Sequence, residues 1–135
     1  MNGRIVILED DEDIRELFSV FLQELGFEIH LFSQVFENLT DVERLAPDLM
    51  IVDVYIGGTQ EGWEFVHRLK AHPATAHIPL ILCTAGKLTS EQEATTESSG
   101  IPILYKPFEL DELHLLVHRF IVSSSRVAER PLPME

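Results

Sequence analysis

Short apolar runs that end at polar residues constrain the fold of this chain more than any other feature. One run, Leu49 to Val52, leads directly into Asp53, and another, Ile5 to Leu8, leads into Glu9 and Asp10. Four consecutive apolar residues next to a turn or a charged cluster are typical of a strand buried on both faces. The chain therefore has to build a sheet with cover on each side.

Helical and strand patterns alternate along the rest of the sequence. Apolar residues at helical spacing follow the first run, and Gly26 stands where that helix would end. We expect further elements in this order: an edge strand at 27–32, a helix capped by Ser33 and running to about Leu45, a helix at 63–70, a strand at 79–83, a polar helix at 90–99 with a capping box from Thr89 and Gln92, a strand at 101–105 and a helix at 110–121.

Five alternations of strand and helix with short connections predict an α/β fold, a doubly wound parallel sheet of five strands in the order 2-1-3-4-5. The 135 residues form one domain, which we place at 1–122. Residues 123–135, with serines and then two prolines, are expected to be a free tail or the start of a linker.

Charge and hydropathy exclude several classes of partner. A net charge of −13 argues against direct binding of nucleic acid or an anionic membrane, since both require basic surface. No apolar run approaches the roughly 20 residues that span a bilayer, and the first apolar run is too short for a signal peptide. The single Cys83 lies inside an apolar run, as a core thiol of a reducing compartment would. We expect a cytoplasmic protein.

Polar side chains stand where four of the predicted strands end. Glu9 and Asp10 follow the first strand and Asp53 the third, Thr84 follows the fourth, and Lys106 follows the fifth. The carboxyl ends of parallel strands point the same way, and strands 1 and 3 are neighbours in the predicted order. Asp10 and Asp53 should therefore face each other across a small crevice.

Clustered carboxylates raise one another's proton affinity unless a cation neutralises them. A set of oxygen ligands favours Mg²⁺, which shares phosphate oxygens and suits phosphoryl transfer. Lys106 and the Thr84 hydroxyl could each bind a phosphate oxygen. Each part has a plainer interpretation, as a helix start, a turn residue or a surface lysine. Their joint placement favours Asp53 as a nucleophile that becomes phosphorylated.

Five short motifs are informative in combination: Ile7-Leu8-Glu9-Asp10-Asp11 with Ile14-Arg15, Pro47-Asp48-Leu49 through Asp53, Gly62-Trp63-Glu64, Pro79 to Ala85, and Lys106-Pro107-Phe108. Together they make residues 3–122 similar to the receiver domain of two-component response regulators, whose fold is flavodoxin-like. The resemblance implies that the chain is a signalling protein rather than an enzyme with a separate substrate, and that it assists its own phosphorylation and dephosphorylation.

The same resemblance implies roles for individual residues. Asp53 would accept a phosphoryl group from a sensor histidine kinase or a histidine phosphotransfer protein. Asp10 would bind Mg²⁺ directly, Glu9 through water, and Tyr55 through its backbone carbonyl, while Asp53 completes the metal site. Asp11, an additional acid, is interpreted as a helix-start residue.

Thr84 and Lys106 match the pair that binds the phosphoryl group in the family, and the Lys106–Pro107 bond matches one that is cis. The signal would leave through the face formed by the fourth helix, fifth strand and fifth helix. The fourth helix has almost no apolar face beyond Ala94, so it should be weakly anchored.

Three positions depart from the family pattern. Gly57 replaces a common proline, and Ile103 replaces a common aromatic switch residue. Tyr105 is expected to point to the other face of the sheet from Ile103. Tyr55 is large enough to overhang an acyl phosphate, and we hypothesise that it shields the phosphoryl group from water.

Two rival functions remain open from the sequence. A haloacid-dehalogenase-type phosphatase needs a second Asp two residues after the nucleophile, where this chain has Tyr55. A receiver-like module could bind partners without being phosphorylated, although competent residues fill all five site positions. His114 and His118 are four apart on a predicted helix and are interpreted as solvent-facing rather than metal ligands.

Overall fold

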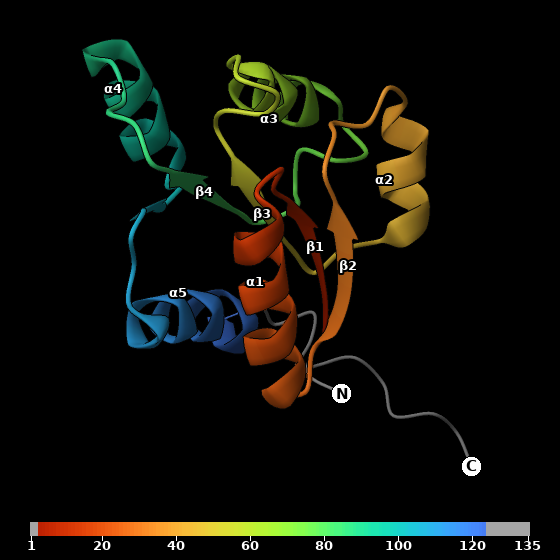
Figure 1. Cartoon of the computed structure of the whole chain (residues 1–135). Coiled ribbons are helices and arrows are strands. Elements are labelled where there is room, and N and C mark those ends of the chain that lie inside the picture. The colour runs from red at the N-terminus through yellow and green to blue at the C-terminus, as the bar shows by residue number, and fades with distance from the viewer. Residues whose placement is uncertain (1–2, 124–135) are drawn as a thin grey trace.

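The computed structural model describes residues 3–123. It alternates strands and helices throughout: β1 (Arg4–Leu8), α1 (Glu12–Glu24), β2 (Glu28–Phe32), α2 (Leu39–Leu45), β3 (Leu49–Asp53), α3 (Glu61–Ala71), β4 (Leu80–Thr84), α4 (Ser90–Ser99), β5 (Ile103–Tyr105) and α5 (Leu110–Ser123). The strands form one parallel sheet in the order β2-β1-β3-β4-β5. The predicted fold class and strand order are confirmed (Figure 1).

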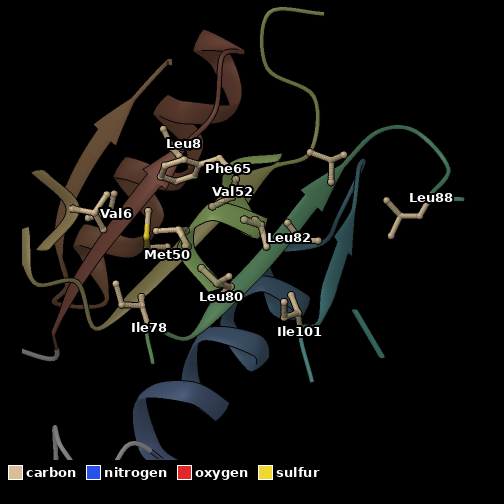
Figure 2. Packing of buried hydrophobic residues seen from close by; sticks show 14 residues of the cluster. Val6, Leu8, Met50, Val52, Phe65, Ile78, Leu80, Leu82, Leu88 and Ile101 are labelled. Atoms are coloured by element: carbon tan, nitrogen blue, oxygen red, sulfur yellow. The ribbon is translucent and has the colours of Figure 1, made fainter. Parts of the chain in front are cut away.

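The sheet separates two hydrophobic cores. Figure 1 shows α1 and α5 together on one face of the sheet and α2 and α3 on the other. Because successive side chains of a strand point to opposite faces, each buried strand feeds both cores. Figure 2 shows the core on the α2 and α3 side, to which three strands contribute alternate residues: Val6, Leu8, Met50, Val52, Leu80 and Leu82.

Every residue of β3 and β4 is buried, whereas β2 is partly exposed along its length. The central strands are therefore buried on both faces of the sheet, as predicted. β2 is the edge strand expected from its alternation of apolar and polar residues.

Three predicted helix signals are confirmed. The Asp11 carboxylate accepts hydrogen bonds from the first turn of α1 and is its N-cap, as its interpretation as a helix-start residue implied. Gly26 follows α1 with φ +93°, a conformation that glycine adopts without strain. Thr89 and Gln92 form a reciprocal capping box at α4.

The predicted start of the second helix is wrong. Ser33 caps nothing, and α2 begins only at Leu39. A guanidinium from α3 explains the difference, because Arg68 donates to the carbonyls of Phe36 and Glu37 at 3.0 and 2.8 Å. Those two acceptors are thereby held outside a helix by a residue that is distant in sequence.

The predicted tail falls almost entirely on residues 124–135, outside the described part of the chain. Within residues 3–123, no helix has the length and apolar character required to cross a membrane.

Candidate functional site

Three carboxylates meet where β1 and β3 end. The strands pair with Leu8 opposite Val52, so the residues that follow them emerge at the same edge of the sheet. Glu9, Asp10 and Asp53 each present an oxygen within 4.8 Å of the others. The structure thus brings together the three acids that the sequence singled out.

Lys106 lies between two of these acids. Its Nζ is 2.8 Å from Asp53 Oδ2 and 2.8 Å from Glu9 Oε1. Burial lowers the pKa of Lys106, but the two carboxylates outweigh burial and raise the pKa above its ordinary value. The Lys106 backbone N–H donates to the Thr84 carbonyl at 2.8 Å, and the peptide bond to Pro107 is cis. Lys106 is therefore a fixed positive charge beside the candidate nucleophile.

Glu9 is the most deeply buried member of the cluster, with 1% of its surface exposed. Burial raises the pKa of its carboxyl group to about 7; Lys106 opposes this shift and Asp53 adds to it. Its Oε2 accepts the Asp11 N–H at 3.1 Å, and its Oε1 is paired with the Lys106 ammonium 2.8 Å away. Ionising a buried carboxyl group beside two other acids is costly, and a bound cation would lower that cost.

Asp10 and Asp53 are both tied to the loop that follows β3. Asp10 is exposed, and its Oδ2 accepts the N–H of Gly57 at 2.8 Å. Asp53 Oδ1 accepts the Tyr55 N–H at 3.0 Å. All ligands offered at this edge are oxygens, and one lies open to solvent, a donor set that suits a hard, partly hydrated ion such as Mg²⁺. The residues present fit the predicted metal.

Thr84 lies at the carboxyl end of β4, but its hydroxyl is directed at its own loop. Thr84 Oγ1 accepts the Gly86 N–H at 3.1 Å and lies 3.2 Å from the Gly86 carbonyl, to which it can donate. The side chain is fully buried. Thr84 is thus close in the sheet to Asp53, and it has no hydrogen bond to the acid cluster.

Gly62 has a role that the sequence reasoning missed. A Cβ added at Gly62 would lie 1.7 Å from the backbone oxygen of Asp53 and 2.9 Å from that of Val54. The next residue, Trp63, donates its N–H to the Val54 carbonyl at 3.2 Å. The first turn of α3 therefore packs directly on the backbone that presents Asp53. The one sequence signal for this contact is the Gly62-Trp63-Glu64 motif.

The Tyr55 ring covers the loop after β4. A Cβ added at Gly86 would lie 3.2 Å from Tyr55 Cε2, so a glycine there leaves room for the ring. The prediction that Tyr105 and Ile103 point to opposite faces is wrong, because residues two apart in a strand share a face. Ile103 packs on the same core as Tyr55, while Tyr105 is 45% exposed. The tyrosine of β5 is consequently not in the core beside Tyr55.

His114 and His118 are both exposed on α5, with ring centroids 6.1 Å apart. Neither belongs to a metal-binding group among residues 3–123, where the acid cluster is the one such group. The interpretation as solvent-facing histidines agrees with this placement.

Comparison with known proteins identifies relatives in sequence and in structure. The family model of the response regulator receiver domain matches residues 5–118. The phosphate regulon transcriptional regulatory protein PhoB of Rhizobium meliloti is 30% identical over 113 residues, which are 84% of this chain and 49% of that protein. The chain spans about half the length of the curated relatives it matches.

Solved structures agree in fold. The signal receiver domain of a DNA binding response regulator from Colwellia psychrerythraea has 26% identity and a TM-score of 0.75, covering 89% of this chain and 98% of its own. The receiver domain of the sensor histidine kinase PA1611 from Pseudomonas aeruginosa, crystallised with a magnesium ion in its active site cleft, has 24% identity and a TM-score of 0.75, covering 90% and 98%. This chain belongs to the receiver domain family of two-component response regulators.

Proposed function

We propose that Asp53 accepts a phosphoryl group, in a Mg²⁺-dependent reaction, from a sensor histidine kinase or a histidine phosphotransfer protein. The observation that carries this proposal is the placement of the Asp53 carboxylate: buried at a strand end, 2.8 Å from Lys106, and clustered with Glu9 and Asp10. The phosphorylated form would differ from the resting form in its affinity for partner proteins.

The metal would be held by Asp10 and Asp53, by Glu9 through water, and by the backbone carbonyl of Tyr55. When bound, Mg²⁺ supplies positive charge that offsets the charge of the acids and of the phosphoryl oxygens. The clustered carboxylate oxygens of Glu9, Asp10 and Asp53 support this assignment.

The chain's own residues would share the remaining work. An Asp53 oxygen attacks phosphorus as the bond from phosphorus to the donor nitrogen breaks, and an acyl phosphate forms. Lys106 stays paired with the charge that passes from the carboxylate to the phosphoryl oxygens. Thr84 would rotate its hydroxyl from the Gly86 carbonyl to a phosphoryl oxygen, which would shift the loop between β4 and α4.

The output surface in this proposal is the face formed by α4, β5 and α5. Tyr105 and Leu110 are both more than a third exposed there and could contact a protein partner. The net charge of −13 disfavours direct contact with nucleic acid or an anionic membrane. No enzymatic activity toward a separate substrate is proposed. A domain over 1–122 that works in the cytoplasm is proposed on the family resemblance alone.

Phosphorylation with acetyl phosphate and Mg²⁺ tests the proposal. We expect intact-mass analysis to show the gain of one phosphoryl group, which is absent when EDTA is present from the start and absent from Asp53→Asn. Asp41→Asn, a change in an exposed acid of α2, is the matched control and should keep the gain.

A folded parent protein that gains no phosphoryl group would contradict the proposal. That result would favour the alternative, a receiver-like module that binds partners without phosphorylation. Circular dichroism on the same samples establishes whether the fold is intact.

A further inference from the structure

A continuous series of hydrogen bonds runs from Asp53 to the first turn of α4. Asp53 Oδ1 accepts the Tyr55 N–H at 3.0 Å, and the Tyr55 hydroxyl accepts from Gln60 Nε2 at 3.3 Å. Gln60 Oε1 then accepts from Gln92 Nε2 at 3.4 Å, and Gln92 Oε1 accepts the Thr89 N–H at 3.0 Å. The series links the loop after β3, the start of α3 and the cap of α4.

The fourth helix depends on this link more than an apolar helix would. Its buried side chains, Gln92 and Thr96, are both polar, and Ala94 is exposed. Thr96 donates its hydroxyl to Glu93 within the same helix. In residues 3–123, the bond from Gln92 to Gln60 is therefore the one side-chain hydrogen bond that joins α4 to another element.

Gln60 is available for this role because it does not cap α3. It occupies the N-cap position, but its side chain makes no capping hydrogen bond. Both ends of its amide are instead used between elements, one toward Tyr55 and the other toward Gln92. Ile103 of β5, which packs on the same core as Tyr55, has no hydrogen-bonding group that could make such a link.

We propose that Gln60 and Gln92 are positioning residues that carry the state of Asp53 to α4 through Tyr55. This inference rests on the proposed phosphorylation of Asp53. Forming an acyl phosphate removes the negative charge from the carboxylate and places it on the phosphoryl oxygens. The Tyr55 N–H then loses a charged acceptor, and a charge-assisted hydrogen bond is roughly twice as strong as a neutral one. The change releases Tyr55, and with it the amide of Gln60 and the cap of α4.

The decisive variant is Gln60→Met, which keeps the length of the side chain and removes both hydrogen bonds. Gln23→Met, a change in an exposed glutamine of α1, is the matched control. Gln60→Glu is the rescue variant, because its carboxylate can accept from Gln92 Nε2 and from the Tyr55 O–H. Each protein is treated with acetyl phosphate and Mg²⁺, and modification of Asp53 is read by intact mass.

The response of α4 is read from backbone amide NMR shifts at Thr89 and Gln92. We expect Gln60→Met to gain the phosphoryl group as the parent does, while the shift changes at these amides fall at least twofold. Hydrogen exchange of the same amides in the unmodified protein should become severalfold faster. Gln23→Met should behave as the parent, and Gln60→Glu should recover most of the α4 response.

Equal α4 responses in the parent and in Gln60→Met would overturn the inference, and so would a modified parent whose α4 amides do not move. A parent that gains no phosphoryl group would overturn the proposed function and, with it, the signalling role of Gln60. The two failures are distinguishable because intact mass reports failure of the proposed function and amide shifts report failure of the inference.

Discussion

The contact between Gly62 and the backbone of Asp53 makes Gly62→Ala the sharpest test of how the site is supported. An added Cβ would lie 1.7 Å from the Asp53 oxygen, whereas ordinary contacts of a Cβ begin at 3.4 Å. The obstructing atom belongs to the backbone of a buried central strand and cannot rotate away as a side chain could. The first turn of α3 would have to withdraw from β3.

The cost can be worked out from the contacts that such a withdrawal disturbs. Overpacking a core costs about 1–3 kcal/mol even where side chains can adjust. A gap of roughly 0.5–1 Å also forfeits a quarter to a half of each dispersion contact, here beneath Phe65 and Leu69 of α3. We therefore expect Gly62→Ala to lower the free energy of unfolding by about 3–4 kcal/mol, and Tm by at least about 10 °C.

Gly58→Ala is the matched control, because it tests backbone strain without a steric clash. Gly58 has φ +81° and nothing within 4 Å of an added Cβ, so its substitution should cost only about 1–2 kcal/mol. Urea unfolding, followed by circular dichroism and by the fluorescence of the single Trp63, measures both variants. A loss for Gly62→Ala no larger than that for Gly58→Ala would refute the packing argument.

Three further predictions concern side chains of the site and core. The pKa of Glu9 is raised from 4.5 in the unfolded chain to about 7, so the stability that this group contributes is present below about pH 4.5 and is lost as pH rises through 7. In EDTA, Glu9→Gln should accordingly gain up to about 3 kcal/mol relative to the parent between pH 5 and pH 8; a difference that does not change with pH would contradict this. Burial raises the pKa of Cys83 to about 12, so a thiol reagent at pH 8 should react only after unfolding in urea, and rapid reaction of the folded protein would be evidence against the assigned burial. Tyr55→Asn should shorten the lifetime of phosphorylated Asp53 if the ring shields it from water, and an unchanged dephosphorylation rate would exclude that role.

Features that depend on local patterns could be predicted from the sequence. The caps at Asp11 and at Thr89 with Gln92 involve residues within three positions of one another, so the sequence contains everything needed to form them. The buried strands could likewise be identified, because a strand that is buried on both faces of a sheet consists of a continuous apolar run. One topological rule then placed Asp10 and Asp53 at the same edge of the sheet.

Other features depend on residues that are distant in the sequence. For these features the local sequence pattern made no prediction or a wrong one. The start of α2 is displaced by Arg68 from another helix, so the capping signal at Ser33 is not used. The buried face of α4 consists of Gln92 and Thr96, and Gln92 can be buried there because its side-chain amide donates a hydrogen bond to Gln60. A polar side chain can be buried when such a partner exists, and the partner is absent from any local window.

The acid, the hydroxyl and the lysine at the strand ends were determined by the sequence, since their positions follow from where apolar runs stop. The tertiary structure alone decided how they meet. It placed Lys106 between two carboxylates, buried Glu9 beside them, turned the Thr84 hydroxyl toward Gly86, and pressed Gly62 against the strand that carries Asp53. These are distances between segments that close packing sets, and residue patterns within one segment do not encode them.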